Sequence, residues 1–77
     1  MSHTPNQLSD QFPAKAEQIH ALKLDDAHFA RLADEYEALN QQIHRAETDI
    51  EPVDDTIAET WRKQRLALLD AIAPYLR

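Results

Sequence analysis

The chain has 77 residues, of which fourteen are acidic and eight basic, so its formal net charge at pH 7 is −6. The absence of glycine excludes Gly-rich phosphate loops and the dinucleotide fingerprint, which need close backbone approach. The absence of cysteine excludes disulfides, thiolate metal sites and a cysteine nucleophile. A chain of this length forms one small domain with little interior.

No part of the sequence is typical of a membrane protein or a secreted protein. No apolar run approaches the ~18 residues that a membrane span needs. The first residues lack the basic start and the apolar core of a signal peptide. We therefore expect a cytoplasmic protein that has no membrane partner.

The N-terminal part of the chain is polar at first and then weakly helical. Residues 1–8 contain a proline and show no hydrophobic periodicity, so we expect a disordered lead there and a single helical domain over residues 9–77. A short helix is predicted at about residues 11–22, with Ser9 or Asp10 as its N-cap. Ile19 and Leu22 are its main apolar contacts, and alone it would be marginally stable.

A long helix is predicted at about residues 26–48, because its apolar side chains recur at alternating spacings of three and four. Either Asp25 or Asp26 can cap its first turn. This heptad seam consists of Phe29, Leu32, Tyr36, Leu39, Ile43, Ala46 and Ile50.

A turn is predicted at residues 49–55, because Pro52 forces the preceding residue out of helical geometry. The last helix then runs over about residues 56–73, with Asp54 or Asp55 as its N-cap. Pro74 removes a backbone hydrogen bond, so we expect the regular helix to end or kink there.

Two long helices joined by a short turn predict an all-α fold, a coiled-coil-like antiparallel hairpin with a short N-terminal helix. Reflecting the chain about residue 52 pairs Ile43 with Trp61, Tyr36 with Leu68, Leu32 with Ile72, and Phe29 with Tyr75. Every one of these pairs is apolar on both sides. The predicted hairpin core consists of Phe29, Leu32, Tyr36, Leu39, Ile43, Ile50, Ile57, Trp61, Leu68, Ile72 and Tyr75.

The last helix carries more apolar surface than one partner helix can cover. Leu66, Leu69 and Leu76 form the extra face, which we expect to pair with its copy in a homodimer and so complete a four-helix bundle. A higher assembly would form if the short first helix docked on a neighbour. The pattern leaves open whether that helix docks on its own hairpin or on another copy.

Few residues suggest a catalytic site or a metal site. His28 and His44 lie on opposite flanks of the long helix, and the spacing of His44 and Glu47 supplies at most part of a metal site. The serines, Ser2 and Ser9, lie in the loose N-terminus. We therefore expect no enzyme: no catalytic residue, no cofactor and no metal.

Two functions remain. The first is a non-enzymatic protein–protein interaction module that self-associates and acts on an unknown protein partner as adaptor or regulator. The second is a small nucleic-acid-associated regulator that uses the basic patch Arg62, Lys63 and Arg65. These three side chains point to different sides of a helix, and the acidic chain repels phosphate, so the sequence favours the first.

The chain also resembles the small bacterial YdcH-like proteins, a family of unknown function, over roughly residues 18–77. The resemblance is carried by His28-Phe29-Ala30-Arg31-Leu32, Glu35-Tyr36, Leu39, Ile43-His44-Arg45, Glu47, Glu51-Pro52, Asp54, Asp55, Arg65-Leu66, Leu68 and Asp70. It implies a short cytosolic helical hairpin that associates, and it implies no activity, cofactor or catalytic residue. Pro74 departs from the more regular helix end that the family would lead us to expect.

Overall fold

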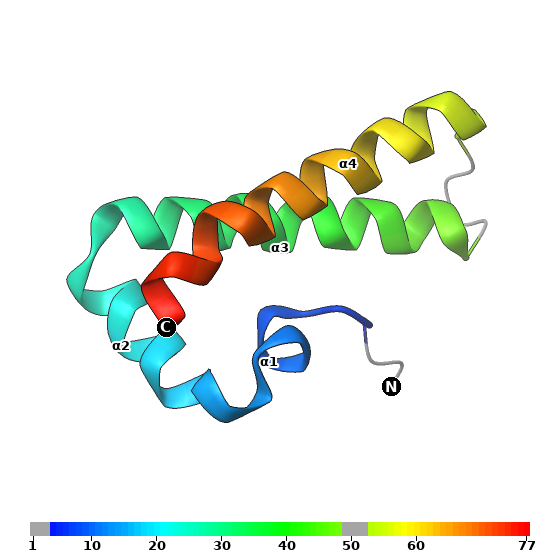
Figure 1. The fold of residues 1–77 in the computed structure, drawn as a ribbon. Helices are drawn as coiled ribbons and strands as arrows, with labels where there is room; N and C mark the ends of the chain where they lie inside the picture. Colours follow the sequence, from blue (N-terminus) through cyan, green and yellow to red (C-terminus); the bar gives the residue numbers. More distant parts are fainter. Residues whose placement is uncertain (1–3, 49–52) are drawn as a thin grey trace.

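The computed structural model describes residues 4–48 and 53–77 of the chain, and within these ranges every regular element is a helix (Figure 1). The all-α fold class is therefore confirmed. In chain order the elements are α1 (Leu8–Gln11), the 3₁₀ helix η1 (Pro13–Lys15), α2 (Ala16–Asp25), α3 (Ala27–Glu47), α4 (Asp55–Ile72) and the 3₁₀ helix η2 (Ala73–Leu76). No described helix is long and apolar enough to cross a bilayer.

The two longest helices, α3 and α4, pack against each other and run in opposite directions (Figure 1). Phe29 in α3 meets Tyr75 in η2 edge to face, with ring centroids 5.4 Å apart and an interplanar angle of 67°. This contact is one of the four apolar pairs expected from the reflection about residue 52. Pro74 lies in η2, so the α-helix ends at Ile72 and the chain tightens into a 3₁₀ turn.

An aspartate caps the N-terminus of each of the two long helices. Asp26 accepts a hydrogen bond from the backbone N–H of Phe29 at 3.0 Å, and Asp54 accepts one from that of Thr56 at 2.7 Å. These two residues, not Asp25 and Asp55, are therefore the N-caps. Asp26 is also the single residue between α2 and α3, and its extended backbone (φ −128°, ψ 106°) turns the chain there.

The N-terminal part differs from the expectation. Residues 4–8 are placed against the rest of the chain, and Leu8 is only 3% exposed, so the disordered lead does not hold for them. The predicted helix at 11–22 is instead split by Phe12 and Pro13 into α1, η1 and α2. We call residues 4–25 the N-terminal segment. Residues 1–3 lie outside the described residues.

The core lies where the N-terminal segment, α3 and the C-terminal part of the chain meet. Its central cluster consists of Leu8, Ile19, Phe29, Ala33, Tyr36, Ile72 and Leu76. Of the predicted core residues, Phe29, Tyr36, Ile43 and Ile72 are buried, whereas Leu32, Leu39, Trp61, Leu68 and Tyr75 are half-buried.

Two predicted core residues do not lie in this core. Ile57 is 46% exposed, which corrects its assignment to the hairpin core. The physical reason is its place: Ile57 lies in the first turn of α4, at the end where α4 diverges from α3 (Figure 1). Ile50 lies outside the described residues.

The predicted dimer interface also needs correction. Leu76 is 3% exposed and belongs to the core cluster, and Leu69 packs against that cluster half-buried. Gln18 in α2 donates a side-chain hydrogen bond to the carbonyl of Tyr75 at 3.1 Å, which fastens the N-terminal segment to η2. Only Leu66, 59% exposed, remains on the surface. The extra apolar face of α4 is therefore largely covered by the chain itself, not left for a second copy.

Candidate functional site

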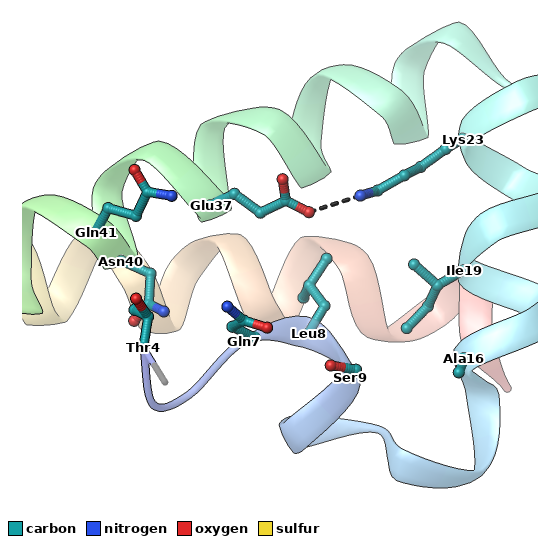
Figure 2. Close-up of a pocket in the computed structure, with 10 residues that line it drawn as sticks. All are labelled: Thr4, Gln7, Leu8, Ser9, Ala16, Ile19, Lys23, Glu37, Asn40 and Gln41. Atoms are coloured by element: carbon teal, nitrogen blue, oxygen red, sulfur yellow. Dashed lines mark hydrogen bonds and ion pairs between the residues drawn. The ribbon is translucent and has the colours of Figure 1, made fainter. Parts of the chain in front are cut away.

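The N-terminal segment does not close completely on α3, and a pocket of about 280 Å³ remains between them. Figure 2 shows its lining, which comes from the start of the segment, from α2 and from the middle of α3. At one end of the pocket Lys23 Nζ lies 2.6 Å from Glu37 Oε1, an ion pair that ties α2 to α3. Both side chains are partly exposed, so the pair contributes little to stability.

Asn40 is the buried polar residue of this region, with 2% of its surface exposed. Its Nδ2 donates a hydrogen bond to the carbonyl of Pro5 at 2.8 Å. Its Oδ1 accepts one from Nη1 of Arg65 in α4 at 2.9 Å. A buried amide is tolerated here because both of its ends have partners. Asn40 therefore joins three separate parts of the chain.

Tyr36 lies one turn before Asn40 on the same face of α3, and it is fully buried. Its hydroxyl donates a hydrogen bond to the carbonyl of Asn6. Burial raises the pKa of Tyr36, an effect opposed by the charge of Arg65 and reinforced by that of Asp10. The phenol therefore stays protonated and remains a donor at neutral pH. We call Tyr36 and Asn40 together the carbonyl clasp, because they bind two consecutive backbone carbonyls.

The backbone of Asn6 is left-handed, with φ at 63°. Asparagine is among the few residues other than glycine that adopt this conformation readily. The torsion angles of Asn6 set the orientation of its own carbonyl relative to that of Pro5. This local geometry is what allows α3 to bind both carbonyls from one face.

The predicted basic patch is not assembled as one surface. The guanidinium of Arg65 donates a hydrogen bond to Asn40. Lys63 Nζ lies 3.5 Å from Glu59 Oε1, an ion pair across one turn of α4. Arg62 is exposed and lines a hollow of about 150 Å³ near the start of α4. The three basic side chains thus lie in three different environments, as expected for positions that point in different directions around a helix.

The histidines are likewise separate. His28 Nδ1 is within hydrogen-bonding distance of the hydroxyl of Tyr75, and the two rings lie 5.9 Å apart. His44 is half-buried on the other side of α3. Among residues 4–48 and 53–77 no group of three or more His, Cys, Asp or Glu side chains is placed to hold a metal ion.

Sequence reasoning missed the carbonyl clasp. Asn40 follows Tyr36 by four positions and precedes Ile43 by three, so it lies on the same stripe of the helix as the apolar seam. A polar residue on an apolar stripe was the available signal. The partners of that residue could not be found from the sequence, because Pro5 and Arg65 lie 35 and 25 positions away.

A second surface lies between α3 and α4, away from the N-terminal segment. It is an open groove of about 430 Å³ lined by Glu35, Leu39, Gln64, Ala67 and Leu68. On the helical wheel of α3, Leu39 faces away from Glu37 and Gln41, which line the pocket under the N-terminal segment. The α3–α4 pair thus has one flank covered by its own chain and one flank open.

Comparison with known proteins gives one match. A model of the family described as "Protein of unknown function (DUF465)" matches residues 29–76. The match confirms the resemblance seen in the sequence, since the YdcH-like proteins belong to that family. It spans α3, α4 and η2 apart from the first two residues of α3, and it stops short of the N-terminal segment. No curated protein and no solved structure matches the chain.

Proposed function

Because the chain belongs to the DUF465 family, whose function is unknown, we propose its role from its own surface: a non-enzymatic interaction module that self-associates. The observation that carries this proposal is the open groove between α3 and α4. A second copy of the chain occupies the groove, and the pair then acts as an adaptor or regulator of a protein partner in the cytoplasm.

The lining of the groove suits helix–helix packing. Leu39 and Leu68 are only half-buried, so each still has apolar surface to lose to a partner. Ala67 is exposed and small, and a small side chain allows a second helix to approach closely. Pairing two such flanks about a two-fold axis gives a bundle of four helices, the α3 and α4 of each copy.

Charge supports the same occupant. The chain as a whole carries a net charge of −6, which opposes self-association wherever acidic surfaces meet. Of the described residues that line the groove, Glu35 alone is charged. Gln64 lies in the same groove and can donate an amide hydrogen bond to Glu35 of a second copy. The flank therefore avoids most of the repulsion that the rest of the surface would impose.

The nucleic-acid alternative has less support. Arg65 already binds Asn40, and Lys63 lies beside an acidic side chain. A phosphate backbone would therefore meet a divided patch on an acidic chain. This alternative predicts retention on heparin that weakens as salt is raised, whereas the interaction module predicts no retention.

Sedimentation equilibrium at tens of micromolar tests the proposal with two variants of adjacent residues in α4. Ala67→Glu places a carboxylate in the groove beside Glu35 and should shift the wild-type dimer towards monomer. Leu66→Glu adds the same charge about 100° further round the helix and should leave the dimer intact. A monomeric wild type refutes self-association. A dimer broken by Leu66→Glu but not by Ala67→Glu refutes the groove as its site.

A further inference from the structure

The carbonyl clasp has the geometry of a peptide-binding site. We propose that Tyr36 and Asn40 form a site for a peptide turn, which the chain's own Pro5 and Asn6 occupy, and that the site also takes such a turn from another molecule. The ligand class is a segment with two consecutive free carbonyls, a left-handed asparagine or glycine, and a leucine two residues later. This inference is independent of the proposed self-association, because it concerns the opposite flank of the α3–α4 pair.

A contact between α3 and α4 orients the amide donor of the site. Arg65 donates to Oδ1 of Asn40, so the amide can face the peptide only with its Nδ2 donor. Burial raises the pKa of Tyr36 and keeps its hydroxyl protonated. With the segment bound, both side chains are almost completely buried and their polar atoms have partners. A donor pair of this kind reads backbone carbonyls, not the side chains of the ligand.

Site and occupant come from different parts of the chain. Tyr36, Asn40 and Arg65 all lie within the region matched by the family, whereas Pro5 and Asn6 lie outside it. The occupant is also weakly structured by itself, since α1 has four residues and η1 has three. Helices this short are not stable alone, so the segment depends on the contacts that α3 supplies.

The apolar anchor completes the recognition. Leu8, two residues after Asn6, is 3% exposed and packs in the core cluster with Ile19. The pocket of about 280 Å³ beside it leaves room around the bound segment. A competing peptide therefore needs the two carbonyls and the leucine at the same spacing. Covalent attachment gives the chain's own segment an effective concentration on the order of millimolar, so a foreign peptide competes in wild type only at about that concentration, and at lower concentration when the segment is weakened.

A matched pair of full-length variants at position 6 tests the proposal. Asn6→Val should release the chain's own segment, because a β-branched side chain does not tolerate a φ of 63°. Asn6→Gly keeps that backbone accessible and should leave the segment bound. The probe is a fluorescein-labelled peptide copying residues 4–12, followed by fluorescence anisotropy. We expect Asn6→Val to bind it about tenfold or more tightly than do wild type and Asn6→Gly.

Two further measurements decide between the clasp and unspecific exposure of apolar surface. Asn40→Leu in the Asn6→Val background should abolish peptide binding, as should replacing the leucine of the peptide by aspartate. Equal binding by all variants, or binding that survives Asn40→Leu, overturns the proposal. If circular dichroism shows that Asn6→Val has lost helicity, isotope-labelled wild type with millimolar unlabelled peptide decides instead. Displacement must then shift the backbone signals of residues 4–8, and unchanged signals overturn the proposal.

Discussion

Arg65 of α4 donates a hydrogen bond from Nη1 to Oδ1 of Asn40 in α3 over 2.9 Å. Through the other end of the same amide, Asn40 holds the carbonyl of Pro5 at 2.8 Å. One side chain thus connects α4 to the start of the chain, and its orientation is set by Arg65 of α4. The consequences of this relationship can be measured.

Asn40→Leu should lower the free energy of unfolding by about 1–3 kcal/mol, because the carbonyl of Pro5 and the guanidinium of Arg65 each lose their partner in a partly buried place. Urea denaturation followed by circular dichroism measures the change. The neighbouring Gln41 is exposed, so Gln41→Leu is the control and should change stability by under about 0.5 kcal/mol. Equal effects of the two substitutions would contradict the role given to Asn40.

The raised pKa of Tyr36 predicts a loss of stability in alkali. The folded chain holds the phenol proton more tightly than the unfolded chain, in which Tyr36 has its ordinary pKa of 10.0. The stabilising contribution is therefore complete below pH 10.0 and decreases as the pH rises above this value, where the unfolded chain ionises first. Urea denaturation between neutral pH and strong alkali should show this decrease in wild type. Tyr36→Phe removes the titrating group, so the same part of the pH dependence should be missing from that variant.

Two isoleucines of α4 should differ in their contribution to stability because only one of them is buried. Ile72 is fully buried in the core cluster, so Ile72→Ala should cost about 2–5 kcal/mol of unfolding free energy. Ile57 is 46% exposed, and Ile57→Ala should cost under about 0.5 kcal/mol. Thermal and urea denaturation of the two variants give the comparison. A cost at Ile57 that matches the cost at Ile72 would return Ile57 to the core.

Two neighbouring aspartates, Asp25 and Asp26, should differ in their effect on stability because only Asp26 caps α3. Asp26→Ala removes the acceptor for the backbone N–H of Phe29 and should cost about 1 kcal/mol. Asp25 is the last residue of α2 and makes no cap for α3, so Asp25→Ala is the control and should be nearly neutral. Urea denaturation of both variants tests the assignment. A larger loss at Asp25 would place the start of α3 one residue earlier.

The long helices could be predicted from the sequence because their apolar patterns extend over several turns. The apolar seam placed the central helix at about residues 26–48, and α3 spans Ala27–Glu47. The aspartates at 54 and 55 and Pro74 similarly bracketed α4, which spans Asp55–Ile72. Periodicity sustained over several turns leaves little freedom in where a helix begins and ends.

The N-terminal segment could not be predicted in the same way. Leu8 is a single apolar residue in a polar stretch, so it produces no period. Its burial depends on residues far along the chain, among them Tyr36 and Ile72 of its core cluster, which no local pattern records. The wheel of α4 showed that its apolar arc was too wide for one partner helix. It could not show that residues 4–25 would cover Leu69 and Leu76.

The covered flank of the α3–α4 pair also limits the valency of the molecule. A pair of helices with two open apolar flanks can stack with copies on both sides and grow into a filament. Here residues 4–25 already lie on one flank, so the proposed contact through the remaining groove would stop once two chains had met. A chain that loses its N-terminal segment would regain the second flank, and open-ended growth would then be its expected behaviour.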